Sequence, residues 1–113
     1  MIFRQLFDPT SSTYTYVLAD EDSGEAVIID TVFEQANRDL ALLRELDLEL
    51  LFAIDTHCHA DHVTGAWLMK QKTGCQIAAA KKIGAANVDL ALSHGDRIRF
   101  GAHTLEEIGR AHV

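Results

Sequence analysis

The N-terminal part of the chain consists of short runs of β-branched, aromatic and aliphatic residues that are separated by polar turn residues. The first run, residues 2–7, ends at Asp8-Pro9, and the second, residues 13–18, ends at the acidic, glycine-containing stretch 20–24. Residues 25–30 form the returning run. Because such runs bounded by turn residues are typical of strands, the pattern predicts strands that begin by pairing as hairpins.

The spacing of the apolar residues changes after position 32. Apolar side chains then recur every three or four residues, which places them on one stripe of a helix. The stripe consists of Phe33, Ala36, Leu40, Leu43 and Leu46. A short apolar run at 50–54 predicts a buried strand, and residues 63–72 predict a second helix that ends at Gly74. Residues 75–79 predict a further strand.

The last part of the chain returns to short strands. Residues 81–92 show neither the period of a strand nor that of a helix, and their structure is ambiguous. Residues 93–96 have the composition of a turn. Residues 97–100 and 103–106 predict two strands around a tight turn. Strands that first pair by hairpins and then alternate with helices predict an α/β layered domain.

Composition and charge narrow the functional classes. The 113 residues are 48% hydrophobic and 24% charged, which fits one small globular domain or part of a larger one. The formal charge of −7 argues against nucleic acids and anionic membranes as partners, because their phosphates need basic residues. No apolar run approaches the ~20 residues of a membrane span. With neither a signal peptide nor a disulfide scaffold, the expected location is the cytoplasm.

Three histidines and an aspartate lie directly after the predicted strand 50–54: His57, His59, Asp61 and His62. His57 and His59 share a face at a strand end, with Cα atoms about 6.6 Å apart at ~3.3 Å per residue. Both imidazoles can therefore reach one metal ion at ~2.1 Å per bond. The spacing predicts a metal centre on a strand-to-helix loop, with His57 and His59 as direct ligands and Asp61 and His62 nearby.

Several other residues have two interpretations. Asp61 could instead cap the following helix, and Asp30 could either brace the site or belong to an ordinary turn. The hydroxyl-rich run 11–16 could contact a ligand or form a polar strand face. Residues 67–69 are expected in the core rather than against a cofactor, and Cys58 is expected to pack rather than to ligate. Two further histidines are expected in turns or at the surface: His94 and His103.

The stretch 56–62, Thr-His-Cys-His-Ala-Asp-His, matches the T-H-x-H-x-D-H signature of the metallo-β-lactamase superfamily, and the resemblance extends to about residue 106. Three stretches, 7–16, 56–65 and 94–101, resemble its persulfide dioxygenase branch, also called sulfur dioxygenases and often labelled glyoxalase II-like. The resemblance implies an αββα sandwich, of which this chain supplies the N-terminal half. It also implies one non-haem Fe(II), which oxidises glutathione persulfide with O₂ to sulfite and glutathione.

The resemblance implies an iron held by two histidines and one aspartate, an arrangement that leaves positions open for O₂ and substrate. His57 matches the first ligand, and the other two lie further along the chain in the family. His59, Asp61 and His62 match residues that bind zinc in hydrolase relatives, so the alternative is a binuclear zinc thioester hydrolase of the glyoxalase II type (hydroxyacylglutathione hydrolase). Relatives tend to have Asp-Pro at 30–31, where this chain has Asp-Thr, which affects the rigidity of that turn.

Residues 1–106 are therefore interpreted as a partial metallo-β-lactamase-like domain. Residues 107–113 are interpreted as a non-native tail, because their codons would resemble a common sequencing-library adapter, and His112 is then no ligand. We expect the truncated chain to be inactive alone and to leave one sheet face uncovered. A non-functional metal-binding fragment is the remaining alternative. The full-length protein is expected to act on a small glutathione derivative, and a homodimer is compatible with the resemblance.

Overall fold

The computed structural model describes residues 1–56, 65–81 and 88–107. The strands are β1 (Ile2–Asp8), β2 (Thr13–Ala19), β3 (Glu25–Ile29), β4 (Glu49–Asp55), β5 (Gln76–Ala80), β6 (Leu90–Leu92), β7 (Arg97–Phe100) and β8 (His103–Glu106). The helical elements are the 3₁₀ turn η1 (Phe33–Gln35) and the helices α1 (Ala36–Glu45) and α2 (Ala66–Thr73). Among these described elements, no helix is long and apolar enough to cross a membrane.

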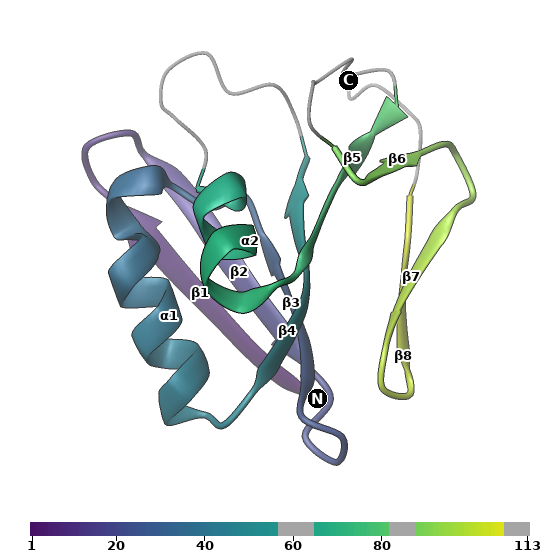
Figure 1. Ribbon diagram of the computed structural model, residues 1–113, viewed down its shortest axis with the longest axis horizontal. Coiled ribbons are helices and arrows are strands. Elements are labelled where there is room, and N and C mark those ends of the chain that lie inside the picture. Colours follow the sequence, from purple (N-terminus) through teal and green to yellow (C-terminus); the bar gives the residue numbers. More distant parts are fainter. Residues whose placement is uncertain (57–64, 82–87, 108–113) are drawn as a thin grey trace.

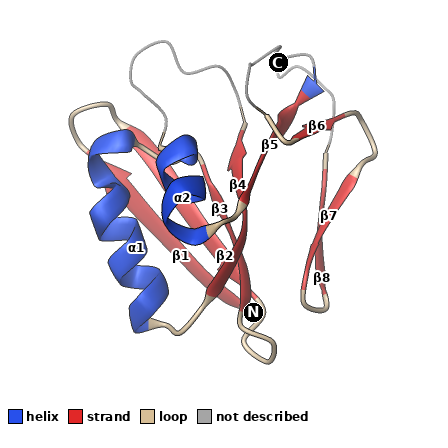
Figure 2. Ribbon diagram, viewed as in Figure 1, coloured by secondary structure: helices blue, strands red, loops and turns tan. Residues whose placement is uncertain are grey.

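Six strands form one sheet in the order β1-β2-β3-β4-β5-β6, and β7 pairs with β8 in a second sheet. Neighbours β1, β2 and β3 are antiparallel, as expected for strands joined by tight turns. From β3 to β6 the neighbours are parallel, with longer connections between them. The carboxyl ends of β3, β4 and β5 therefore lie along the same edge of the sheet (Figure 2).

The large sheet has different neighbours on its two faces. Helices α1 and α2 cover one face, and the β7–β8 hairpin lies on the other (Figure 1). Because successive strand residues point to opposite faces, Ile28 packs in the helix-side cluster with Met69, whereas Val27 packs with Ile54 and Phe100 under the hairpin. The layers are thus helix, sheet, sheet, which confirms the expected half of an αββα sandwich.

Two carboxylates attach the β7–β8 hairpin to the large sheet: Asp20, directly after β2, and Glu25, the first residue of β3. The Ala102 N–H donates to Asp20 Oδ2 at 2.6 Å, and the Gly101 N–H donates to Glu25 Oε1 at 2.7 Å. The first of these bonds, together with one from the Asp22 N–H, holds the pKa of Asp20 below its usual value. The hairpin is therefore docked by a charged carboxylate as well as by its apolar side chains.

Two aromatic side chains differ from their predicted placement. Trp67, which is expected in the core, is 57% exposed, and Phe33, which is assigned to the apolar stripe of the first helix, is 42% exposed. The buried side chains of α2 are Ala66 and Met69, three residues apart, and Trp67 lies outside that stripe. Phe33 belongs to the 3₁₀ turn before α1, so the helical spacing that links it to the α1 stripe does not apply there.

The other predicted elements are confirmed within the described residues, including the end of α2 at Gly74, which has φ of 79°. The ambiguous stretch 81–92 contains the short strand β6, and its residues 82–87 lie outside the described ranges. Backbone hydrogen bonds of 2.8 Å join Glu107 to Gly95 and Asp96, which extends the hairpin pairing by one residue. Residues 108–113 of the predicted tail are not described.

Candidate metal centre

The four predicted metal ligands, His57, His59, Asp61 and His62, lie outside the described residues. Within 1–56, 65–81 and 88–107, no group of three or more His, Cys, Asp or Glu side chains could hold a metal ion. The described residues therefore offer no competing site. The donor set of segment 57–62 suits iron or zinc, because it combines imidazoles with a carboxylate.

Strand β4 brings the chain to this segment at the carboxyl edge of the large sheet. It lies between its parallel neighbours β3 and β5 and ends at Asp55, one residue before Thr56. In open α/β sheets, ligands bind in the crevice outside the carboxyl ends of the strands. The histidine-rich segment thus follows the strand at the place where such a site is expected.

Asp30 holds the residue that precedes the segment. Its Oδ1 accepts the Thr56 N–H at 2.8 Å, and its Oδ2 accepts the Thr56 hydroxyl at 2.5 Å. Asp30 has a left-handed backbone, φ 58°, and its own N–H donates to Ile54 O at 2.8 Å. Of the two interpretations of Asp30, the structure supports the brace, because both carboxylate oxygens contact the chain directly before His57.

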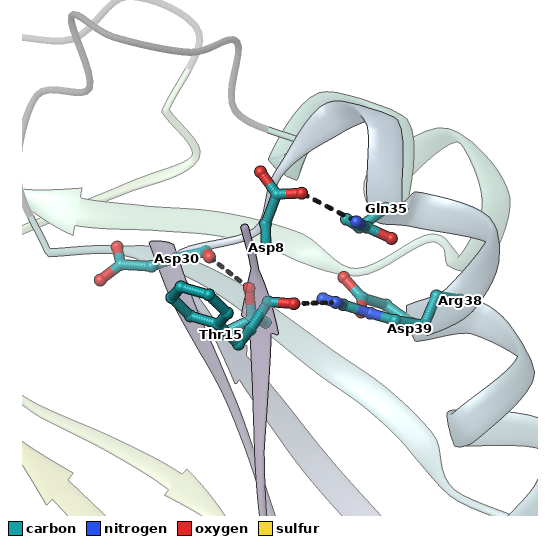
Figure 3. Close-up of polar contacts among 7 residues, drawn as sticks. Asp8, Thr15, Asp30, Gln35, Arg38 and Asp39 are labelled. Atoms are coloured by element: carbon teal, nitrogen blue, oxygen red, sulfur yellow. Dashed lines mark hydrogen bonds and ion pairs between the residues drawn. The ribbon is translucent and has the colours of Figure 1, made fainter. Parts of the chain in front are cut away.

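A second polar cluster lies at the carboxyl end of β1 (Figure 3). Asp8 Oδ2 accepts the Ser11 hydroxyl at 2.6 Å and the Ser11 N–H at 3.0 Å, and Asp8 Oδ1 accepts Gln35 Nε2 at 2.8 Å. These hydrogen bonds lower the pKa of Asp8 to about 2. The Ser11 hydroxyl, which also lies 2.9 Å from Thr13 Oγ1, is thus engaged within the protein.

Helix α1 contributes a partly buried ion pair beside this cluster, in which Asp39 is buried and Arg38 is partly exposed. Arg38 Nε donates to Asp39 Oδ1 at 3.0 Å, and Arg38 Nη1 donates to the Phe7 carbonyl at 3.0 Å (Figure 3). Burial raises the pKa of Asp39, and the Arg38 guanidinium opposes that shift. The hydrogen bond from Arg38 to the Phe7 carbonyl ties α1 to β1.

Thr15 belongs to the hydroxyl-rich run 11–16, and the sequence pattern alone assigns it no separate role. Its side chain is fully buried, and its hydroxyl donates to the Asp30 carbonyl at 2.8 Å (Figure 3). The alternation of side chains along the strand could have indicated this role. Thr15 shares a strand face with the buried Val17 and Ala19, so its hydroxyl is expected to be buried and to hydrogen-bond within the protein.

A cavity of about 160 Å³ adjoins Thr56 between the two sheets. Apolar residues of both sheets line it, together with three acidic residues from or beside the β7–β8 hairpin: Asp96, Glu106 and Glu107. Of the two histidines expected in turns or at the surface, His94 is exposed and His103 packs against Phe100. Burial raises the pKa of the Cys75 thiol.

Comparison with known proteins places this geometry in a family. The family model described as "Metallo-beta-lactamase superfamily" matches residues 8–108. The chain is 49% identical over 107 residues to the proteins named "Persulfide dioxygenase ETHE1, mitochondrial" of Mus musculus and Homo sapiens, covering 94% of this chain and 42% of each relative. It is 35% identical over 94 residues to the hydroxyacylglutathione hydrolase of Cereibacter sphaeroides, covering 81% of this chain and 36% of that protein.

A solved structure agrees with the sequence relatives. The crystal structure of ETHE1 from Myxococcus xanthus has a TM-score of 0.90 and 44% sequence identity, covering 94% of this chain and 47% of that one. The chain therefore spans less than half the length of these relatives. Since the family model covers most of the chain and the layers agree, the chain belongs to the metallo-β-lactamase superfamily.

Proposed function

We propose that the full-length protein is a non-haem iron persulfide dioxygenase that oxidises glutathione persulfide with O₂ to sulfite and glutathione. The observation that supports this most strongly is the 49% identity over 107 residues to proteins named persulfide dioxygenase. The identity to a hydroxyacylglutathione hydrolase is lower, 35% over 94 residues. Because the chain spans 42% of the dioxygenase relatives' length, the activity is proposed for the full-length protein.

In this proposal His57 holds the iron together with a histidine and an aspartate from further along the chain, as the family resemblance implies. Bound iron would supply the redox chemistry for the reaction of the persulfide with O₂. Asp30 holds the Thr56 backbone and hydroxyl and so orients the residue before His57. His59, Asp61 and His62 lie near the iron in this proposal.

The second candidate is a binuclear zinc thioester hydrolase of the glyoxalase II type. It is favoured by the presence of both Asp61 and His62, which match ligands of a second zinc ion, and by the similarity to the Cereibacter sphaeroides hydrolase. Asp61 and His62 would help to hold the second zinc ion, and the two ions would supply an activated water for the hydrolysis of a glutathione thioester.

Metal analysis of the full-length protein separates the two candidates. The dioxygenase is expected to contain one iron and to consume O₂ with glutathione persulfide, whereas two zinc ions and thioester hydrolysis would establish the alternative. The same oxygen measurement applies to the 113-residue chain, which we expect to be inactive alone. Oxygen uptake by that chain with glutathione persulfide would overturn its proposed inactivity.

We also propose a cytoplasmic location, because the sequence contains only two cysteines and therefore no disulfide scaffold. The relatives of Mus musculus and Homo sapiens are named as mitochondrial. Cell fractionation with the full-length protein tests the proposal, and recovery in mitochondria would contradict it.

A further inference from the structure

The two described residues that flank segment 57–64 are attached to consecutive residues of the chain after β3. On the entry side, Thr56 donates its N–H and its hydroxyl to the Asp30 carboxylate, at 2.8 and 2.5 Å. On the exit side, the Gly65 N–H donates to the Thr31 carbonyl, with 3.3 Å between nitrogen and oxygen. The dipeptide Asp30-Thr31 therefore sets the positions of both flanking residues.

Close packing reinforces the contact on the exit side. A Cβ atom at Gly65 would lie 3.2 Å from both Thr31 Oγ1 and Val32 O, which is tighter than an ordinary van der Waals contact. Gly65 also accepts the first hydrogen bond of α2, from the Met69 N–H at 2.9 Å. The start of α2 is therefore held directly against residues 31–32.

The dipeptide needs support, because Asp30 has a left-handed backbone that is unfavourable for a residue with a side chain. Two hydrogen bonds fix its main chain. Its N–H donates to Ile54 O at 2.8 Å, and its carbonyl accepts the Thr15 hydroxyl at 2.8 Å. Because Thr15 is fully buried, water does not compete with its hydroxyl for the Asp30 carbonyl.

We propose that Thr15 is a positioning residue for the candidate metal centre. Its hydroxyl holds the Asp30 carbonyl, and this keeps Asp30 in the left-handed conformation that directs its carboxylate to Thr56. The hydroxyl is the essential group, because valine would fill the same volume without donating a hydrogen bond. The consequence for metal binding, though not the contact itself, rests on the proposed function.

The test compares variants of the full-length protein at one position. In Thr15→Val, we expect the Thr56 amide to exchange with deuterium about tenfold faster and the affinity for Co²⁺ to fall about tenfold, the low end of the usual effect of outer-shell changes. Thr15→Ser retains the donor and should restore both. Val17→Ala is the matched control, since Val17 is equally buried on the same strand face. It should destabilise the protein without selectively exposing the Thr56 amide.

The outcomes distinguish this proposal from the proposed function. Unchanged protection of the Thr56 amide in Thr15→Val, or equal loss in Thr15→Ser, would overturn the positioning role. Loss of protection only in Thr15→Val, with unchanged Co²⁺ affinity, would show that Thr15 holds Asp30 and Thr56 but would overturn its role in positioning the metal centre. Absence of Co²⁺ binding in the wild type would instead contradict the proposed function. If Thr15→Val does not fold, Thr15→Cys replaces it, because a thiol is a much weaker donor than the serine hydroxyl.

Discussion

Asp30 has a left-handed backbone, and its carboxylate contacts Thr56. A useful substitution therefore changes the carboxylate without disfavouring the backbone conformation. Asparagine tolerates the left-handed region and keeps one oxygen acceptor, but it loses the charge and the second acceptor. In Asp30→Asn we therefore expect Thr56 to be held less firmly, with metal affinity of the full-length protein reduced about 10–100-fold. Competition with a chromophoric chelator measures this affinity.

Asp47 provides the control for that substitution. It also has a left-handed backbone, φ 56°, but it is exposed in the loop between α1 and β4. Asp47→Asn should leave metal affinity unchanged. If the two asparagine variants bind metal equally well, the Asp30 carboxylate does not support the centre.

The Asp8 carboxylate should contribute to stability in a pH-dependent way. Its pKa in the folded protein is lowered from 3.8 to about 2, chiefly by the Ser11 hydroxyl and the Gln35 amide. A lowered folded-state pKa gives stability that is present above the unfolded value and lost as the pH falls through the folded value. Between about pH 4 and pH 2, the Tm of the wild type should therefore fall more steeply than that of Asp8→Asn. Parallel Tm curves for the two proteins would contradict this assignment.

At the scale of elements, the docking of the β7–β8 hairpin depends on a glycine. Gly101 has φ of 61°, and an added Cβ would lie 1.9 Å from Asp20 Oδ2. Gly101→Ala should lower the free energy of unfolding for two reasons. An alanine in the left-handed backbone region costs roughly 1–2 kcal/mol, and the overpacked Cβ costs a further ~1–3 kcal/mol. Urea denaturation of the 113-residue chain measures the sum.

Gly95→Ala isolates the backbone contribution. Gly95 also has a positive φ, 92°, but nothing lies within 4 Å of an added Cβ. We expect this variant to be clearly more stable than Gly101→Ala. Equal unfolding free energies would mean that the Asp20 contact does not restrict the hairpin.

The elements that could be predicted are those with a clear local signal. Strands β1 to β5 are short runs of β-branched, aromatic or aliphatic residues, helix α1 has helical spacing, and Gly74 marks the end of α2. Strand β6 has three residues, too few to show a period within 81–92. Trp67 was misplaced because an eight-residue helix with two buried side chains has only a weak stripe.

The sequence pattern predicts ligands for the candidate site, which lie outside the described residues, but it does not predict the contacts that support the residue before them. The pattern of 57–62 suggests a metal by residue type and spacing alone. The contacts of Asp30 with Thr15 and Thr56 join residues 15 and 26 positions apart in the sequence. They depend on strand register and on one left-handed backbone angle, neither of which a local pattern specifies.

At the scale of the whole molecule, the hairpin covers only part of the second face of the large sheet. Phe7 lies opposite Tyr14 in the β1–β2 register, and their rings are 4.8 Å apart. By strand alternation they share a face with Val27, which the hairpin covers, yet Phe7 is 44% and Tyr14 48% exposed. Phe3, on the same face, is 51% exposed. Aromatic side chains therefore extend this uncovered surface to the edge strand β1.

An uncovered apolar face beside an edge strand favours self-association of the 113-residue chain. The double variant Phe7→Thr/Tyr14→Thr keeps β-propensity and removes the exposed ring pair, so we expect less light scattering and a lower apparent mass in size-exclusion chromatography. Its Tm should fall slightly, because the aromatic pair contributes about 0.5–1.5 kcal/mol. Trp67→Thr removes a comparably exposed ring from α2, on the helix side of the sheet, and should leave association unchanged. Equal reductions in both variants would show that general surface hydrophobicity, rather than the uncovered sheet face, causes the association.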